Sequence, residues 1–411
     1  MSTPEKVTTR ALVVWAAAVA VYIAAVTGRT SMGVAGTAAI DHFGIDASRL
    51  AVFTSVQVGV YALAQIPTGV AIDRFGPRKL LFVGSVIMAI GQIILGLKSS
   101  YGVAIAARVL IGAGDATAFL SVMRILPAWF PLRKTPVFTQ LTAALGQLGQ
   151  FLSAVPFMAV LHAQGWMPAF VSLGTSIAVL AVVTGLLIAD APHAPLHTPG
   201  ADLPLRSKLG LVVRSPVCWE GFFSHWIGLM PNLMFLLLWG VPLITLGLGL
   251  SPAYAGAALV ANSVVQVFVS PIHGFISSRL GPQRVWAVVT GAFIVTGTAG
   301  WFFTHKSSVM VLSLVLGVMS LLSNYGFDMV RENIDRRVLA TGTGLANMGG
   351  FVSGMITAQA FGVLLDVSAR KASHPGIYRW EDFQVASWSI AVMLGLGLVG
   401  LVTSRVLSRY R

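Results

Sequence analysis

The stretch RVLIGAGDATAF, residues 108–119, places Arg108 and Asp115 inside a long apolar run. A charged side chain in the middle of a bilayer costs at least ~2.5–3.5 kcal/mol, so both residues require a physical reason. They are seven positions apart, which puts them on one face of a helix but about 10 Å apart along its axis, too far for a direct ion pair. Gly112 lies between them on this face and leaves room for a ligand, water or another helix.

Two roles are open for these charges. In the structural role, Arg108 and Asp115 each pair with residues of other helices. In the proton-coupling role, Asp115 binds and releases a proton as a cavity opens and closes, because desolvation favours the neutral acid and a nearby cation opposes it. Arg108 would then tune the affinity of Asp115 for the proton.

A third charge, Arg29, lies near the middle of the apolar segment YIAAVTGRTSMGVAG, residues 22–36. A guanidinium stays charged and presents a planar fork that suits a carboxylate or a phosphate. Tyr22, Arg29 and Gly36 share one helix face at seven-residue spacing. We predict that Arg29 contacts an anionic substrate. The alternative is an ion pair with Asp115 at rest, and both hold if this carboxylate occupies an empty anion site.

Apolar helices must position these charges. The chain has 411 residues, of which 56% are hydrophobic and only 10% are charged, and a mean hydropathy of +0.82. A surface so poor in charge does not keep a protein dispersed in water. Apolar stretches of about 20 residues are long enough to cross a bilayer as helices. The sequence therefore predicts an all-α membrane protein with twelve transmembrane helices.

The predicted spans cover about residues 11–38, 50–72, 79–97, 102–130, 136–161, 167–189, 216–247, 252–277, 285–304, 308–330, 338–366 and 385–408. The first span is too long for the apolar region of a cleaved signal peptide, so we expect it to remain as a membrane helix.

The net charge of +13 follows membrane topology rather than nucleic acid binding. Twelve spans place both termini on one side, and 18 of the 27 Lys and Arg residues lie on that side, against 6 on the other. The positive-inside rule makes the first side cytoplasmic. We expect a multi-pass protein of a plasma or bacterial inner membrane, surrounded by lipid, with both termini in the cytoplasm and no nucleic acid partner.

The chain divides between its sixth and seventh predicted spans. The connection 190–215 is rich in Pro, His and basic residues, and it separates a predicted N-terminal six-helix bundle, 1–189, from a C-terminal one, 216–411. The single cysteine, Cys218, excludes an intramolecular disulfide and a Cys-cluster metal site. We expect no metal and no cofactor.

A short signature recurs in the two halves, as GVAIDRFGPRK at 69–79 and GFISSRLGPQR at 274–284. Four identities share one offset of 205 positions: Gly69, Arg74, Gly76 and Pro77 recur as Gly274, Arg279, Gly281 and Pro282. The acidic position is not kept, since Asp73 corresponds to Ser278. Identities at one offset, between the second and third spans of each half, indicate pseudo-symmetric duplicated halves.

The signature at 69–79 resembles the cytoplasmic loop motif of the major facilitator superfamily, Gly-x-x-x-Asp-Arg-x-Gly-x-Arg-Arg/Lys. The resemblance covers the whole chain, with twelve spans, a central loop and a degenerate second copy. It implies the major facilitator fold, in which two six-helix bundles rock about a central site by alternating access.

The same resemblance implies a gating role for Gly69, Asp73, Arg74 and Arg78. Gly69 allows helices to approach closely, and Asp73 with the basic residues can form a charge network at the inner helix ends. A neighbouring helix start favours a carboxylate, and the implied neighbour is RRVLATGTG, residues 336–344. The alternative is that the basic residues only set the topology.

The stretch RVLIGAGDA is similar to the Arg-x-x-x-Gly-x-x-Glu motif of the anion:cation symporter branch of this superfamily, which carries organic anions, often with protons. Arg108 and Asp115 fall on its basic and acidic positions. The branch also has an arginine in the middle of its first span, where this chain has Arg29. The chain departs from the pattern at Gly28, where the branch often has an acidic residue, and in having the shorter Asp115 for Glu.

Uncharged polar residues on other spans predict a cavity. Together with Arg29, we expect the following residues to shape the substrate site: Tyr22, Gln140, Gln147, His225, Asn232, Trp239, Asn262, Gln266, Asn324 and Asn347. The alternative for each amide is an interhelix hydrogen bond worth around 0.6 kcal/mol, and His225 has the further alternative of a packed helix histidine. For Arg124 and Asp328 we expect snorkelling or an interhelix pair.

These features predict a monomeric secondary active transporter of a small organic anion of the carboxylate type, with proton-coupled symport. An alternative is a proton-coupled efflux antiporter of drugs or metabolites, although the fifth span, GQLGQFLSAVP, lacks the Gly-Pro-x-x-Gly-Gly element typical of such proteins. A non-transporting sensor of the same fold is a third class. An enzyme is not expected, because the sequence has no Cys/His cluster, no Gly-Lys phosphate loop and no nucleotide-binding domain.

Overall fold

A computed structural model of the chain describes residues 6–45, 47–192, 203–372 and 377–409, and the regular elements within these ranges are all helices. The chain forms two compact units. Unit 1 comprises Met1–Val212 with Asp335–Gly344, and unit 2 comprises Val213–Ile334 with Leu345–Arg411. The predicted connection 190–215 lies partly outside the described residues, and its end forms the short helix α9, Leu205–Val213.

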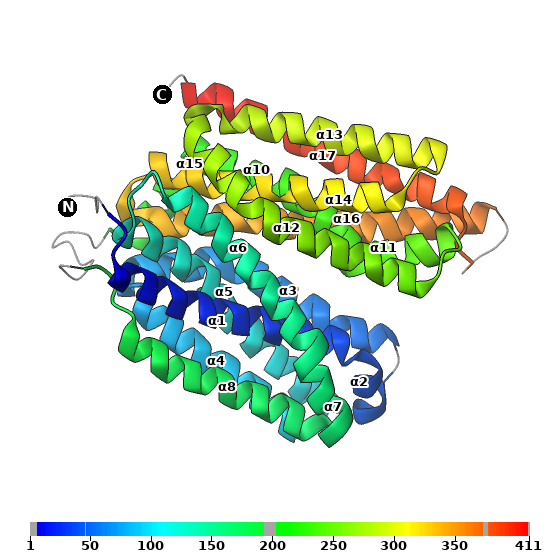
Figure 1. The fold of residues 1–411 in the computed structure, drawn as a ribbon, viewed down its shortest axis with the longest axis horizontal. Helices are drawn as coiled ribbons and strands as arrows, with labels where there is room; N and C mark the ends of the chain where they lie inside the picture. The colour runs from blue at the N-terminus through cyan, green and yellow to red at the C-terminus, as the bar shows by residue number, and fades with distance from the viewer. Residues whose placement is uncertain (1–5, 46, 193–202, 373–376, 410–411) are drawn as a thin grey trace. The chain divides into compact units, whose positions relative to one another are not determined.

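Unit 1 is built from long apolar helices (Figure 1). Its elements are α1 Thr9–Val34, α2 Gly36–Phe43, α3 Ala47–Phe75, α4 Pro77–Leu97, α5 Tyr101–Trp129, α6 Thr135–Leu152, a π-helical turn Ser153–Phe157, α7 Met158–Gln164 and α8 Trp166–Leu187. The Thr8 hydroxyl accepts a hydrogen bond from the Ala11 backbone N–H at 3.2 Å and caps the start of α1.

The first predicted span is interrupted. Helix α1 ends at Val34, and α2 begins at Gly36 after Ala35, whose backbone torsions are φ −83° and ψ 9°. Gly36 therefore does not continue the α1 face that carries Tyr22 and Arg29. The seven-residue spacing was misleading here, because it holds only along an unbroken helix.

Unit 2 repeats the pattern of long helices. Its elements are α10 Pro216–Met234, π-helical turns Phe235–Trp239 and Leu243–Gly247 around α11 Gly240–Pro242, α12 Pro252–Leu280, a 3₁₀ turn Gly281–Gln283, α13 Arg284–His305, α14 Val309–Ser320, a 3₁₀ turn Leu321–Asn324, α15 Tyr325–Asn333 and α17 Trp380–Arg409. Helix α16, Leu339–Lys371, follows a 3₁₀ turn Arg336–Val338 and passes from unit 1 into unit 2 after Gly344.

The recurring Gly-Pro pair lies at a turn between consecutive long helices in both units. Gly76 has φ 86° between α3 and α4, and Gly281 has φ 49° at the end of α12. Glycine adopts positive φ without a steric penalty, and the following proline has the φ of a first helical residue. The duplicated signature therefore encodes a tight turn between consecutive membrane helices.

Ten ranges of the described chain are long and apolar enough to cross a membrane. One of them, Pro252–His305, contains both α12 and α13. The segment 216–247 is also helical, through α10 and the π-helical and α-helical turns that follow it. The described helices thus occupy the positions of all twelve predicted spans, with small differences at their ends.

Helix α5 is the innermost helix of unit 1. It packs against α1, α3, α4 and α6, while α1, α4 and α8 run side by side (Figure 1). Most of α5 is buried, including Arg108 and Asp115, both of which are 0% exposed. The two charges therefore face protein rather than the lipid side of the unit.

Candidate functional site

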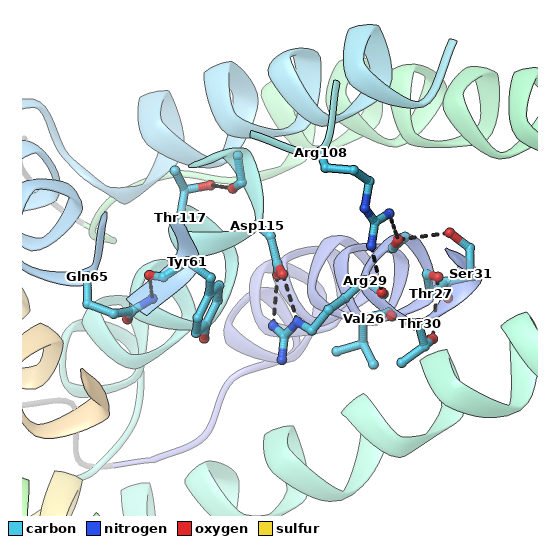
Figure 2. Close-up of polar contacts among 12 residues, drawn as sticks. Val26, Thr27, Arg29, Thr30, Ser31, Tyr61, Gln65, Arg108, Asp115 and Thr117 are labelled. Carbon is cyan, nitrogen blue, oxygen red and sulfur yellow. Dashed lines mark hydrogen bonds and ion pairs between the residues drawn. The ribbon is translucent and has the colours of Figure 1, made fainter. Parts of the chain in front are cut away.

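The site of unit 1 is centred on an ion pair between α1 and α5. The Arg29 guanidinium donates two hydrogen bonds to the Asp115 carboxylate, from Nε to Oδ2 at 2.7 Å and from Nη2 to Oδ1 at 2.9 Å (Figure 2). Asp115 is fully buried, whereas the Arg29 side chain is 18% exposed. The two-pronged geometry is the one that an arginine uses to bind a carboxylate. The predicted resting pair is present.

An aromatic ring of α3 covers the same guanidinium. The Arg29 Cζ lies 4.4 Å from the centroid of the Tyr61 ring, within the range of a cation–π interaction. One turn further along α3, the Gln65 amide nitrogen donates to the Tyr61 carbonyl oxygen at 3.0 Å (Figure 2). Arg29 is thus oriented by a carboxylate from α5 and by a ring from α3.

Arg108 does not form an ion pair with Asp115. Its Nη1 donates to the Gly28 carbonyl oxygen at 3.4 Å and its Nη2 to the Arg29 carbonyl oxygen at 3.3 Å (Figure 2). This agrees with the separation expected along one helix, and the predicted influence of Arg108 on the proton affinity of Asp115 stays a prediction. The physical reason is the separation along α5: both charges reach the same neighbouring helix, but they reach different groups on it.

Another helix fills the gap at Gly112. A Cβ at this position would lie 2.7 Å from the Gln57 carbonyl oxygen of α3, so only glycine permits the close approach. The Gln57 side chain is 0% exposed, and neither its Oε1 nor its Nε2 has a hydrogen-bond partner among the described residues. A buried polar group without a partner costs about 1–3 kcal/mol, so this amide is a candidate for ligand binding.

Sequence reasoning missed the polar face of α3. Gln57, Tyr61 and Gln65 recur at four-residue spacing within the predicted span 50–72. Three polar side chains on one face of a membrane helix indicate a protein-facing polar surface. This spacing was the available signal.

Three predicted site residues lie on α1 and α6. Tyr22 is half-buried, with its ring 5.4 Å from that of Phe119 on α5. Gln140 is fully buried. Gln147 accepts a 2.7 Å hydrogen bond from the Gln150 amide nitrogen of the same helix.

The predicted site amides of unit 2 bind one another. Asn262 Nδ2 donates to Asn232 Oδ1 at 2.9 Å and to the Ser313 carbonyl oxygen at 2.6 Å, and Asn262 Oδ1 accepts from Gln266 Nε2 at 2.7 Å. The Ser320 hydroxyl donates to Gln266 Oε1 at 3.3 Å. This network joins α10, α12 and α14, which corresponds to the interhelix alternative stated for these amides.

Trp239 lies beyond the regular helix that carries His225 and Asn232. Regular α-helix ends at Met234, and the following π-helical turn carries Trp239. The Trp239 ring stacks on Phe361 of α16, with centroids 5.1 Å apart.

The imidazole of His225 is buried in unit 2. Its Nδ1 lies 3.4 Å from the Ser323 carbonyl oxygen, and its Nε2 has no hydrogen-bond partner among the described residues. The ring also packs near Phe327, with centroids 4.8 Å apart. Asn324 and Asn347 are both buried in the same unit.

Asp73 caps the start of α16 within unit 1. Its Oδ1 accepts from the Ala340 N–H at 3.0 Å, and its Oδ2 accepts from the Thr341 N–H at 2.9 Å and the Thr341 hydroxyl at 2.8 Å. A carboxylate is stabilised at a helix N-terminus by these otherwise unpaired donors. A Cβ at Gly69 would lie 2.5 Å from the Ala340 carbonyl oxygen, so the contact requires glycine. The neighbour implied by the family motif is therefore present.

The basic residues of the motif make other contacts than expected. Arg124 of α5, rather than Arg74 or Arg78, pairs with Asp73, with Nε to Oδ1 at 3.4 Å. Arg78 donates to the Gly185 carbonyl oxygen at the end of α8, at 2.6 Å from Nη2, and the Arg74 guanidinium lies 5.1 Å from the Phe75 ring centroid. The turn at Gly76 directs Arg78 away from Asp73 and towards the negative end of another helix.

Comparison with known proteins shows the family of the chain. A family model described as Major Facilitator Superfamily matches residues 18–358. The chain belongs to the Major Facilitator Superfamily. This superfamily member is an integral, multi-pass membrane transporter and not an enzyme, which confirms the predicted fold class and the broad functional class.

Several relatives of this superfamily member are named as transporters of anions. The probable sulfoacetate transporter SauU of Cupriavidus necator is 23% identical over 84% of this chain and 85% of its own length. Probable anion transporter 5 of Arabidopsis thaliana is 25% identical over 85% and 88%. The oxalate:formate antiporter of Oxalobacter formigenes is 26% identical over 75% and 73%. These relatives support the resemblance to the anion-transporting branch.

Solved structures show the same fold at low sequence identity. The proton:xylose symporter XylE has a TM-score of 0.72 at 13% identity and covers 96% of both chains. The superfamily transporter FucP has a TM-score of 0.72 at 12% identity and covers 96% of this chain and 99% of its own. At such identities the likeness concerns the fold alone.

Proposed function

We propose that this transporter carries a small organic anion together with protons, by alternating access between bundles 1–189 and 216–411. The observation that carries the proposal is the two-pronged Arg29–Asp115 ion pair on the innermost helix of unit 1. In this pair the Asp115 carboxylate occupies the arginine fork as the acid group of a substrate would. The anion class is supported by the relatives named for sulfoacetate, for anions and for oxalate.

The proposed mechanism follows from competition for one fork. While Asp115 is ionised, its two carboxylate oxygens accept the hydrogen bonds from Arg29 Nε and Nη2. These two donors are then not available to a substrate anion. A proton on Asp115 removes its charge, weakens the ion pair and releases Arg29 to bind the anion. A proton and a singly charged anion therefore enter together, because this combination leaves the total charge of the site the same in its resting and loaded states; a second charge on the anion requires a second proton for the same balance.

The neutral residues around Arg29 have a proposed role in recognition. Tyr61 restricts the orientation of the guanidinium, and the unpartnered amide of Gln57 offers one donor and one acceptor to a hydroxyl or a second oxygen of the substrate. Tyr22, Gln140 and Gln147 extend the site along α1 and α6. In unit 2, four residues are proposed to line the substrate cavity: His225, Trp239, Asn324 and Asn347. Three amides are proposed to hold the helices of this unit together: Asn232, Asn262 and Gln266.

The topology completes the proposal. Both termini lie in the cytoplasm, the protein works as a monomer in the cell membrane, and Gly69 and Asp73 with Arg74 and Arg78 belong to the cytoplasmic gate. The contact of Asp73 with the start of α16 supports this last role.

The experiment uses purified protein in proteoliposomes and a panel of sulfoacetate, oxalate, D-galactarate and D-glucarate. We expect at least one anion to raise the thermal unfolding temperature and to accumulate in response to an inward proton gradient. Arg29→Ala should abolish both effects with folding intact, and Arg29→Lys should restore little, because lysine lacks the planar fork. Arg10→Ala, at the exposed start of the same helix, is the matched control. Wild-type anion affinity in Arg29→Ala would refute the assignment.

The direction of flux is a separate outcome of this experiment. Uptake driven by an inward proton gradient corresponds to symport. Proton efflux coupled to anion entry, or exchange of loaded anion against external proton, would instead establish the antiporter alternative.

A further inference from the structure

Three side chains converge on one carbonyl in the middle of α1. The Gly28 carbonyl oxygen accepts from the Ser31 hydroxyl at 2.9 Å, from Gln92 Nε2 at 3.2 Å and from Arg108 Nη1 at 3.4 Å. All three donors are 0% exposed. Gln92 belongs to α4 and Arg108 to α5, so two neighbouring helices hold the same turn of α1. This turn directly precedes Arg29.

The same guanidinium also holds the next carbonyl. Arg108 Nη2 donates to the Arg29 carbonyl oxygen at 3.3 Å, so one side chain fixes two consecutive peptide groups. Gly28 lets the Gln92 amide approach closely, because a Cβ at Gly28 would lie 2.7 Å from Gln92 Nε2 and would displace this side chain. The cation of Arg108 is thus stabilised by peptide dipoles, in a region where water does not supply this stabilisation.

This turn of α1 needs external support. The Thr27 hydroxyl donates to the Ile23 carbonyl oxygen and the Thr30 hydroxyl to the Val26 carbonyl oxygen, both at 2.9 Å. Hydroxyls that bond back to carbonyls of the preceding turn slightly destabilise and often bend a helix. The segment that carries Arg29 therefore combines a glycine with hydroxyl groups that compete for backbone acceptors.

We propose that Arg108 is a positioning residue, which fixes the α1 turn so that Arg29 presents its fork to the anion. This inference rests on the proposed function of Arg29. Arg108 acts through the backbone of α1, since it donates hydrogen bonds to the carbonyls of Gly28 and Arg29, while Arg29 itself donates to both oxygens of Asp115.

The first test follows backbone protection of α1 in ligand-free protein by hydrogen–deuterium exchange. In a helix, the carbonyls of Gly28 and Arg29 are the acceptors for the N–H groups of Met32 and Gly33. In Arg108→Met we expect exchange at these amides to rise by about tenfold or more, the size expected for losing a hydrogen bond to a charged donor. Arg108→Lys should restore part of the protection, and Gln92→Leu should give a smaller increase.

Arg29→Ala is the matched control for this measurement. It removes the fork but leaves the donors to the Gly28 carbonyl, so protection of Met32 and Gly33 should stay at the wild-type level. Unchanged exchange in Arg108→Met, Arg108→Lys and Gln92→Leu overturns the inference. If Arg29→Ala retains anion affinity, the proposed function fails, but the exchange result for Arg108 still stands or falls separately.

The second test separates positioning from proton tuning, with sulfoacetate as the probe. A displaced fork lowers affinity steeply, since an error of about 1 Å in positioning can cost about 10²-fold. We expect Arg108→Lys to raise the KM for proton-driven uptake by about tenfold or more, with the pH profile of uptake unchanged. An unchanged KM in Arg108→Lys, which keeps the positive charge but loses the planar fork, overturns the positioning role in favour of proton tuning. If sulfoacetate is not carried, the exchange measurement decides alone.

Discussion

The contact between α3 and α5 in unit 1 has a counterpart between α12 and α14 in unit 2. At the repeat offset of 205 positions, Gly112 corresponds to Gly317 and Gln57 to Asn262. A Cβ at Gly112 would lie 2.7 Å from the Gln57 carbonyl oxygen, and a Cβ at Gly317 would lie 2.9 Å from that of Asn262. The duplicated halves therefore keep the same close helix approach.

The chemistry at these equivalent contacts differs. At the same offset, Arg108 and Asp115 correspond to Ser313 and Ser320, so charges in unit 1 are replaced by hydroxyls in unit 2. Asn262 has amide and carbonyl partners, whereas the Gln57 amide has none among the described residues. The comparison teaches that one scaffold carries a charged, incompletely paired site in one half and a neutral, paired network in the other.

The helix ends that carry the recurring signature show a second difference. In unit 1 the Asp73 carboxylate accepts from the N-terminus of α16. In unit 2 the equivalent Ser278 hydroxyl donates to the Phe275 carbonyl oxygen of its own helix, while Asp328 on α15 accepts from Ser277 and from Arg331. Both units thus have a carboxylate near these helix ends. Asp73 binds the start of α16, whereas Asp328 binds residues of α12 and α15.

The largest expected effect comes from removing the charge of Asp115, compared with a change at its neutral repeat equivalent, Ser320. Asp115→Asn should abolish accumulation driven by a pH gradient, a loss of about 100-fold or more, because the amide cannot take up a proton near neutral pH. Anion exchange between compartments of equal pH should persist. The repeat-equivalent change, Ser320→Ala, should leave both activities close to wild type. Gradient-driven uptake that survives in Asp115→Asn would place the proton site elsewhere, with His225 as the next candidate.

A smaller effect is expected at the inner ends. Asp73→Asn should shift the conformational equilibrium towards the inward-facing state by roughly 5–150-fold, the range of a coupling of 1–3 kcal/mol, because the start of α16 loses a charged acceptor. Labelling of introduced cysteines at the inner and outer ends of the helices, after replacement of Cys218, measures this shift.

The matched control for Asp73 is Ser278→Ala, which removes a hydroxyl that bonds within its own helix. It should leave the labelling pattern unchanged. If Asp73→Asn also leaves inner-side labelling unchanged, the motif residues only set topology and the gating role is wrong.

The smallest expected effect concerns the two buried amides. Asn262→Leu should lower the free energy of unfolding by about 1–3 kcal/mol, because it leaves the partner groups on Asn232, Gln266 and Ser313 unpaired. Gln57→Leu should be neutral or stabilising, because it removes a buried amide that has no partner, yet it should weaken anion uptake. Thermal unfolding in detergent compares the two variants directly. Destabilisation of Gln57→Leu as large as that of Asn262→Leu would contradict the difference between the halves.

Local patterns in the sequence predicted most of the fold. Helices such as α4 and α8 lie within about two residues of their predicted spans, because apolar length and flanking turns determine where a chain can cross a bilayer. The interruption at Ala35 was not predicted, since the residues around it remain apolar and carry no proline.

The sequence predicted which charged residues belong to the site better than it predicted which of them contact one another. Arg29, Asp115 and Arg108 were recognised because a charge within an apolar span is conspicuous. Gln57 and Tyr61 were missed, since uncharged residues cost less in a membrane helix and give a weaker signal.

The sequence by itself determined the helical class, the number of spans, the duplicated halves and the residues that carry charge into the membrane. Tertiary structure alone decided that Asp115 pairs with Arg29, that Arg108 holds the carbonyls of α1 and that Arg124 pairs with Asp73. The physical reason is that helical spacing fixes which side chains share a face, whereas the packing of small residues such as Gly112 decides which helix meets that face.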